Sequence, residues 1–151
     1  MLLTPTLPDL CRSPVDYQAF KIHPDERHRL AISFDPHNAP TDLVSCVEIF
    51  DPGGETPFHQ HQCATELFFV IKGTGFARFN DTCSRLQPGD SVLIPPQRWH
   101  QVGNLGGDRL YLLCVMSPNE GFSELIRRGV TASLDAEDLA TLARTWTALP
   151  A

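Results

Sequence analysis

Lysine is scarce in this sequence, and acidic residues outnumber basic ones. The chain has two lysines, and its 12 basic residues face 18 acidic ones, which gives a formal net charge of -6 and a pI near 5.4. Non-specific nucleic-acid binding needs Lys and Arg to neutralise phosphates. Arg127 and Arg128 form the only adjacent basic pair. We therefore expect no nucleic-acid partner and no attraction to anionic membrane surfaces.

Long apolar runs and paired cysteines are also missing. No apolar stretch approaches the roughly 18 to 20 residues that a membrane-spanning helix needs, and residues 1–8 lack the basic start and apolar core of a secretory signal. The five cysteines show no disulfide or zinc-ribbon spacing. We expect reduced thiols, a cytoplasmic location and no membrane partner. Cys46 and Cys114 lie in apolar runs and are most simply small core residues.

The length of 151 residues fits one domain with a single hydrophobic core. Residues 1–43 are rich in proline and predict an N-terminal arm that leads into a first strand near residues 30–34. Between residues 44 and 118, short apolar runs alternate with turn residues, which is the pattern of an all-β sandwich or barrel. The expected strands are residues 44–50, 66–71, 75–80, 84–87, 91–94, 100–102 and 109–116.

Residues 119–151 predict two short C-terminal helices. Asn119 can cap the first, which carries Phe122 and ends near Gly129. Asp135 can cap the second. That helix has an apolar stripe which predicts a surface covering the barrel or meeting a second subunit: Leu139, Leu142, Ala143 and Trp146.

Two histidines and a glutamate lie close together in the β-rich region. His59 and His61 are separated by one residue, so on an extended strand both side chains project to one side, roughly 6.5 to 7 Å apart. Glu66 opens an apolar run, and a turn through residues 62–65 would bring its carboxylate beside them. Burying that carboxylate costs several kcal/mol unless its charge is compensated, as a metal ion would do. The opposing interpretation is two turn histidines and a solvated glutamate at a strand edge.

The wider spacing resembles a known family. Gly53, His59, His61, Glu66 and Gly73 reproduce the first motif of the cupin superfamily at every interval. The second motif follows at the family's intervals in Gly89, Pro95, His100 and Asn104. Gln97 stands where the family usually has glycine, which puts in doubt the geometry of the turn before His100. The resemblance covers residues 44–118, about half of the chain.

This resemblance implies an all-β double-stranded β-helix, or jelly-roll barrel, with a metal inside it near one mouth. The implied ligands are His59, His61, Glu66 and His100, holding one divalent transition metal. Three imidazoles and one carboxylate suit Fe, Mn, Ni or Zn, whereas Ca and Mg prefer all-oxygen shells. An ion with four protein ligands keeps one or two positions for water, dioxygen or substrate.

Strand alternation from the ligands predicts a largely apolar pocket. Phe68 and Val70 share the side of Glu66, and Val102 shares that of His100. On the last strand, resemblance to small cupins favours one face as lining, although parity alone leaves the opposite face open. The favoured face carries Leu112, Cys114 and Met116.

Four polar residues are candidates for supporting the ion or substrate: Arg78, Tyr111, Glu48 and Gln60. Arg78 either orients an anionic substrate or lies on a solvated edge. Phe122 either closes the pocket mouth or anchors the first C-terminal helix.

The favoured function is a metal-dependent enzyme that acts on a small organic molecule, of the dioxygenase type, because the ligand set leaves room for dioxygen and a chelating substrate. The alternatives are a cupin-type lyase, isomerase or decarboxylase, or a module that binds a small molecule without turnover. Members of the family often pair through their sheets, so we also expect a homodimer.

Overall fold

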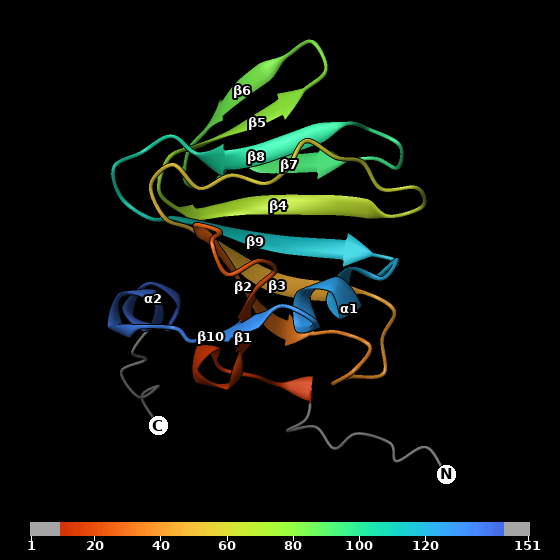
Figure 1. Cartoon of the computed structure of the whole chain (residues 1–151), viewed down its shortest axis with the longest axis vertical. Coiled ribbons are helices and arrows are strands. Elements are labelled where there is room, and N and C mark those ends of the chain that lie inside the picture. The colour runs from red at the N-terminus through yellow and green to blue at the C-terminus, as the bar shows by residue number, and fades with distance from the viewer. Residues whose placement is uncertain (1–9, 144–151) are drawn as a thin grey trace, which may run out of the picture.

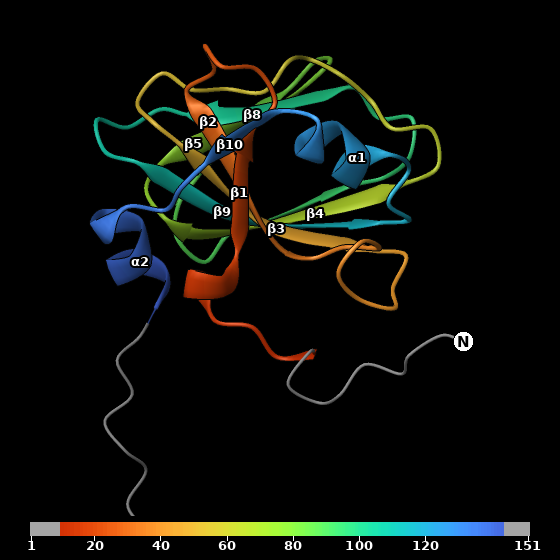
Figure 2. The same ribbon diagram turned by 60° about the horizontal axis from the view of Figure 1, so that its bottom comes forward.

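The computed structural model describes residues 10–143, and most of its elements are strands. Figure 1 shows the strands stacked one above another, with the helices α1 and α2 on opposite flanks of β1 and β10. Figure 2 shows both helices outside a barrel of strands. In chain order the elements are η2 (Pro14–Asp16), β1 (Gln18–Lys21), β2 (His28–Phe34), β3 (Val44–Phe50), β4 (Thr65–Lys72), β5 (Gly75–Phe79), β6 (Cys83–Leu86), β7 (Ser91–Ile94), β8 (His100–Asn104), β9 (Leu110–Ser117), α1 (Phe122–Arg127), β10 (Val130–Ala132) and α2 (Ala136–Leu142).

Two antiparallel sheets form the barrel. The larger has the order β10-β1-β2-β3-β9-β4-β7, and the smaller has the order β6-β5-β8. Two isolated bridges, Glu55 to Gly103 and His59 to His100, tie the segment between β3 and β4 to the smaller sheet. The predicted all-β double-stranded β-helix is therefore confirmed, with short helices after the last barrel strand.

Side-chain alternation separates the barrel interior from the outer face of the larger sheet. The interior is filled by one apolar cluster to which β2, β3, β4 and β9 contribute alternate residues. On the outer face, Val47, Ile49 and Tyr111 form a second cluster, against which Leu134 and Leu142 pack. The even-numbered face of β9 is thus the interior one.

Helix α2 is fastened to that outer face by a buried carboxylate. Asp138 accepts hydrogen bonds from Arg29 at 2.6 and 3.2 Å, from Arg109 at 3.1 Å and from the Tyr111 hydroxyl at 2.9 Å. Asp135 caps α2 through the Asp138 backbone N–H, as predicted. The stripe on this helix covers the sheet through Leu142, whereas Trp146 lies outside the described residues.

The seven expected strands are present with boundaries close to those predicted, but the flanking segments differ from the sequence-based expectation. The predicted strand near residues 30–34 is present as β2, but the arm also contributes β1 to the larger sheet, and β10 pairs with β1 after the first C-terminal helix. Neither β1 nor β10 was expected, because each is only three or four residues long and lacks clear alternation. Within residues 10–143, no helix is long and apolar enough to cross a membrane.

Candidate metal centre and adjoining cavity

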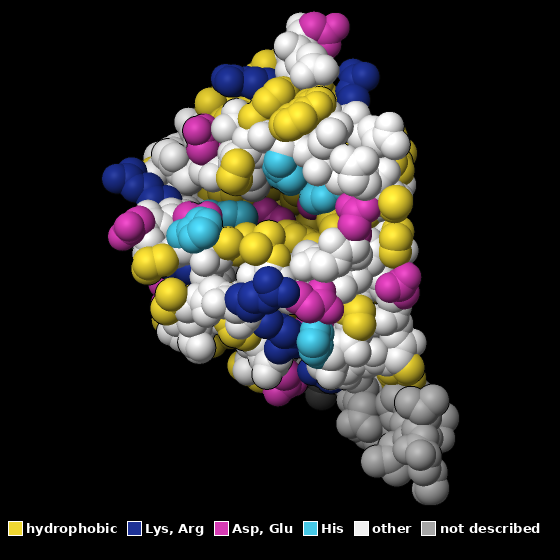
Figure 3. All heavy atoms as spheres, turned by 45° about the vertical axis from the view of Figure 1, so that its right-hand side comes forward, with side chains coloured by type: hydrophobic (Ala, Val, Ile, Leu, Met, Phe, Trp, Pro, Cys, Tyr) yellow, Lys and Arg dark blue, Asp and Glu magenta, His cyan; other side chains and the backbone are white. Residues whose placement is uncertain are grey.

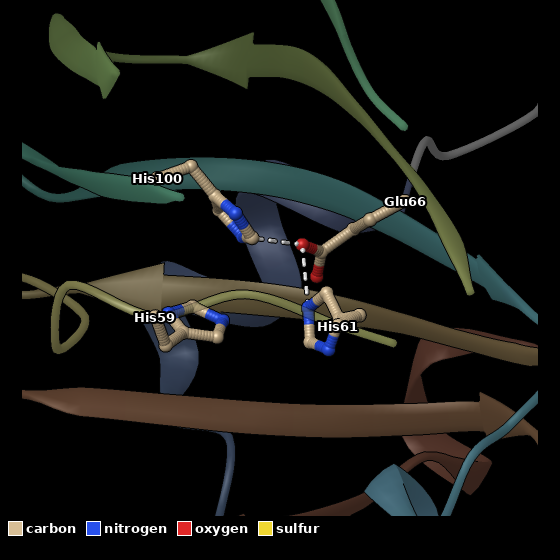
Figure 4. Close-up of side chains that lie close together, drawn as sticks. All are labelled: His59, His61, Glu66 and His100. Atoms are coloured by element: carbon tan, nitrogen blue, oxygen red, sulfur yellow. Dashed lines mark hydrogen bonds and ion pairs between the residues drawn. The ribbon is translucent and has the colours of Figure 1, made fainter. Parts of the chain in front are cut away.

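Four side chains converge inside the barrel. His59 and His61 come from the segment between β3 and β4, Glu66 is the second residue of β4, and His100 opens β8. Their ligating atoms all lie within 4.8 Å of one another. Figure 4 shows the Glu66 carboxylate between His100 and His61, with His59 beside them.

Backbone hydrogen bonds hold the histidines in place. His59 and His100 each donate an N–H to the other's carbonyl, at 2.9 and 2.8 Å, and Gln97 donates its N–H to the carbonyl of His61 at 2.6 Å. His61 itself is in no regular strand, so the alternation argument does not describe this segment. Its conformation follows instead from these bonds to β8 and the turn before it. Glu120 supports the next turn by accepting the backbone N–H groups of Gln62 and Cys63.

Two of the imidazoles are anchored through Nδ1. Nδ1 of His59 lies 2.8 Å from the Pro57 carbonyl, and Nδ1 of His100 lies 2.8 Å from the Arg98 carbonyl. A carbonyl can only accept, so each Nδ1 carries a hydrogen, and Nε2 faces the cluster, where it can bind an ion or, when it also carries a hydrogen, donate to the Glu66 carboxylate. Nε2 of His100 and of His61 lie 3.0 and 3.2 Å from Oε2 of Glu66.

The electrostatics of the cluster favour an ionised carboxylate. Burial would raise the pKa of Glu66, but hydrogen bonds with His100 and His61 outweigh it and lower the pKa to about 2. Burial lowers the pKa of His59. Burial also acts to lower the pKa of His61, yet its contact with Glu66 raises that pKa overall. One negative oxygen and imidazole nitrogens directed at it form a donor set that fits a borderline divalent ion.

Cys114 borders this cluster as a hydrogen-bond donor. Its Sγ lies 3.3 Å from Oε1 of Glu66, the oxygen that the histidines do not contact. A hydrogen bond with Cys46, followed by burial, raises the pKa of Cys114 well above its usual value. The thiol is therefore neutral and unsuited to act as a nucleophile.

A cavity of about 270 Å³ opens beside the cluster. Figure 3 shows histidine and hydrophobic side chains gathered around a hollow on this face of the molecule. The wall is mostly apolar and is formed by Ile22, His23, Glu26, His28, Leu30, Glu48, Thr56, Pro57, His59, His61, Glu66, Phe68, Phe122 and Leu125. Phe122 lies at this wall, with its ring 6.5 Å from that of His61.

The structure divides the predicted pocket residues into two groups. Phe68 lines the cavity. The remaining side chains are buried in the barrel interior and do not form its wall: Val70, Val102, Leu112, Cys114 and Met116. The apolar interior predicted from strand parity thus extends beyond the residues that line the cavity.

The four polar candidates also separate. Glu48 lines the cavity and Gln60 is half-buried next to the ligands. Arg78 is exposed and lies over the Phe76 ring at 5.9 Å, on the opposite side of β5 from the interior residue Ala77. Tyr111 is buried on the outer face of the larger sheet. Both assignments to the site are therefore corrected, because these side chains point out of the barrel.

Sequence reasoning missed the wall that β2 supplies. His28 is 5% exposed, and its Nε2 lies 2.8 Å from Oε2 of Glu48. Its ring stacks on Phe50 with centroids 4.1 Å apart. The available signal was alternation, since His28 shares a strand face with Leu30 and Ile32, but the expected strand began two residues later.

A cupin domain family model matches residues 46–116, which include all four converging side chains. The chain belongs to the cupin superfamily. Among solved structures, this cupin is similar to KdgF from Halomonas sp., with 25% identity, a TM-score of 0.56, and coverage of 68% of this chain and 86% of that chain.

Curated relatives of this cupin differ in what they do. It is 35% identical to auxin-binding protein 1 of Arabidopsis thaliana (47% of this chain, 40% of that protein). It is 31% identical to 1-methylthio-D-xylulose 5-phosphate methylsulfurylase of Rhodospirillum rubrum (58% and 55%). It is 36% identical to 5-aminosalicylate 1,2-dioxygenase of a Comamonas species (43% and 17%). The chain spans about half the length of the first relatives it matches, or less.

Proposed function

We propose that this cupin is a metal-dependent enzyme acting on a small organic molecule, with dioxygenase-type oxidation as its reaction. The observation that carries the proposal is that the four ligating atoms converge beside a largely apolar cavity, whose wall includes His59, His61 and Glu66. A structural ion site needs no such space. A site that processes a small molecule needs both a reactive ion and room beside it.

In this proposal His59, His61, Glu66 and His100 hold one divalent ion of Fe, Mn, Ni or Zn. When bound, the ion supplies Lewis acidity and open positions for dioxygen, water or substrate. The chain's own residues do the rest. The Pro57 and Arg98 carbonyls keep two imidazoles oriented, Cys114 hydrogen-bonds the second carboxylate oxygen, and the apolar wall excludes water from the reacting molecule.

Dioxygenase chemistry is preferred for this site because four protein ligands leave an ion room for both dioxygen and a chelating substrate. The similarity to a 5-aminosalicylate 1,2-dioxygenase supports the preference. The cavity volume of about 270 Å³ suits a single small ring or a short chain. We therefore infer a substrate of that size, mostly apolar, with oxygen or nitrogen donors at one end.

A lyase, isomerase or decarboxylase is the second candidate. It is favoured by the similarity to a methylsulfurylase and by the polar pair His28 and Glu48 in the cavity wall. A module that binds a small molecule without turnover is the remaining alternative, and the similarity to an auxin-binding protein motivates it.

Elemental analysis of the full chain, purified without added metal, is the first test. We expect close to one transition metal per chain, and a content well below one contradicts the proposal. Iron, manganese or nickel favours oxygen chemistry, whereas zinc, which has no redox chemistry, favours the second candidate.

A panel of small chelating molecules then separates the functions. Oxygen uptake with a panel member supports the dioxygenase. Product formation without oxygen uptake supports the lyase or isomerase. Ligand-induced thermal stabilisation with no product from any member supports the binding module.

A further inference from the structure

A second polar pair lies in the cavity wall, separate from the four ligating side chains. His28 at the start of β2 and Glu48 on β3 are 5% and 1% exposed, and both line the cavity. In the β2–β3 register Leu30 pairs with Glu48 and His28 pairs with Phe50. The His28 side chain is therefore the diagonal neighbour of Glu48, two residues along β2 from Leu30 on the interior face. Two ionisable side chains buried in an apolar wall are costly unless they are paired with each other.

The hydrogen bond between them sets the tautomer of His28. Nε2 lies 2.8 Å from Oε2 of Glu48, and an ionised carboxylate can only accept, so Nε2 carries the hydrogen. Nδ1 then holds the lone pair of the neutral ring. Stacking on Phe50, at an interplanar angle of 7°, keeps the ring from turning.

Nδ1 of His28 has no partner in the described part of the chain, and His28 lines the cavity. Among residues 10–143, no hydrogen bond to this atom is found. It is not a fully buried atom either, because within that range the only fully buried side-chain nitrogen or oxygen without a partner is Nε of Arg12. Because His28 lines the cavity and its Nδ1 is not a fully buried atom without a partner, this nitrogen keeps some exposed surface. The arrangement is an imidazole oriented by a carboxylate, with its basic nitrogen open to a ligand.

The pair lies close to the candidate metal centre. An oxygen of Glu48 and the Sγ atoms of Cys46 and Cys114 are all within 4.8 Å of one another, and the Cys114 Sγ lies 3.3 Å from Glu66. One thiol therefore separates the two carboxylates. A molecule in the cavity whose donor atoms reach toward Glu66 can place a neighbouring group against His28.

We propose that His28 is the catalytic base of this cavity and that Glu48 is the residue that positions it. The inference rests on the proposed enzymatic use of the cavity. The substrate class it implies is a small molecule in which an acidic O–H or C–H bond adjoins an oxygen able to bind an ion, as in a catechol or an α-hydroxyketone.

In the step, the O–H or C–H bond breaks, its proton moves to Nδ1, and its electron pair stays on the substrate. The ring becomes an imidazolium whose Nε2–H still donates to Glu48, so the negative carboxylate stabilises the new positive charge. Return of the proton to another atom of the substrate, or to a leaving group, restores the neutral ring. No external oxidant or reductant is needed for this transfer.

Nitrogen NMR on the metal-free full chain tests the pair directly. With ¹⁵N-labelled histidine, His28 should show a protonated Nε2 and an unprotonated Nδ1 near neutral pH, and His28→Gln identifies its signals. Glu48→Gln should shift the population toward the Nδ1-protonated form, because an amide can donate to Nε2. A wild-type ring protonated on Nδ1, or one whose tautomer ignores Glu48→Gln, overturns the assignment.

Binding of 4-nitrocatechol, a chelator whose colour reports its ionisation, tests the base on the metal-loaded protein. At neutral pH we expect His28→Gln to bind the ionised probe about tenfold more weakly, equivalent to about one pKa unit, with unchanged metal content. Exposed His37, which pairs with Glu124 at 3.1 Å, provides the matched control, and His37→Gln should bind like the wild type. His23 and Glu26 also line the cavity, so binding of 4-nitrocatechol to Glu26→Gln is measured at the same pH.

The NMR and the 4-nitrocatechol experiments together separate the failure of this inference from the failure of the proposed function. Equal binding and ionisation of 4-nitrocatechol in wild type and His28→Gln, with metal retained in both, overturns the base. Absence of metal, or of any binding by the metal-loaded wild type, contradicts the proposed function, while the nitrogen shifts still decide the His28–Glu48 pair.

Discussion

His59 and His100 exchange both of their backbone hydrogen bonds, at 2.9 and 2.8 Å, although 40 residues separate them in the sequence. This isolated bridge joins the segment before β4 to the first residue of β8. It brings one histidine from each sequence motif to the same place, with ring centroids 4.3 Å apart. The separation of two candidate ligands is thus set by the backbone and does not depend on a bound ion.

Replacing one of these histidines should remove metal without unfolding the barrel. We expect His100→Ala to lower the metal content from close to one per chain to less than about a tenth, because four-ligand sites lose most of their affinity with one ligand. Elemental analysis after gel filtration measures it, and circular dichroism checks the fold. His37→Ala, which changes an exposed histidine outside the cluster, should keep the wild-type metal content. Unchanged stoichiometry in His100→Ala would contradict the ligand assignment.

Acid should destabilise the metal-free protein partly through Glu66. Its pKa is about 2 in the folded protein against an ordinary 4.5, so the unfolded chain binds a proton more readily. The stability that Glu66 contributes is present above about pH 4.5 and is lost as the pH falls toward 2. Urea unfolding across this window should show a shallower pH dependence in Glu66→Gln than in the wild type. Parallel curves would show that Glu66 is not held ionised by His61 and His100.

The turn before His100 should be improved by glycine. Gln97 is exposed and has a φ of 62°, a left-handed conformation that costs a residue with a side chain about 1 kcal/mol or more. We expect Gln97→Gly to raise the free energy of unfolding by about 1 kcal/mol. Glu120, with a φ of 52°, is the contrasting position, since its carboxylate accepts two backbone N–H groups and Glu120→Gly should bring no gain. Both values come from urea denaturation.

Removing the charge of Asp138 should loosen α2. The carboxylate is fully buried and serves Arg29, Arg109 and Tyr111, so Asp138→Asn leaves buried donors without their charged partner. We expect a loss of about 3 kcal/mol in the free energy of unfolding. Glu137→Gln, on the exposed side of the same helix, should change it by no more than about 0.5 kcal/mol. A similar small loss in both variants would refute the anchoring role.

The homodimer remains a prediction, and the structure indicates where to test it. Leu67, Phe69 and Leu93 are 39%, 41% and 62% exposed on the outer face of β4 and β7. On β9, half-buried Leu113 and Val115 pair with Phe69 and Leu67 of β4 and extend this apolar face. We expect Leu93→Glu to convert a dimer into a monomer in light scattering. Leu105→Glu, in the turn after β8, should leave it dimeric, and a monomeric wild type would refute the pairing.

The strands and the ligand cluster could be predicted because their signals are local. Turn residues bound each apolar run, and the intervals between the histidines, the glutamate and the glycines point to one known arrangement. Gln97 shows the limit of this prediction. The sequence shows a glutamine where the family usually has glycine, and the structure shows that this residue still adopts a left-handed backbone.

The rest depended on pairing between distant segments. Strands β1 and β10 exist only because they pair with each other and with β2, and three or four residues carry no periodicity of their own. For Arg78 the sequence left open either a substrate-orienting role or a solvated edge, and the edge is what the structure shows, since Ala77 is the residue of β5 that packs with the core. His28 was overlooked because the first strand was expected to begin at Leu30.

The cavity wall is divided between the central segment of the chain and the flanks on both sides of it. Thr56, Pro57 and Phe68 come with the ligands from the segment shared with other cupins, whereas Ile22, His28, Leu30, Phe122 and Leu125 come from the flanks. Changes in the flanks can therefore reshape what enters the cavity while the ion site is left intact. Two proteins with the same central segment could hold the same metal and select different molecules. In such chains we expect the flanking segments, and not the ligand motifs, to determine substrate preference.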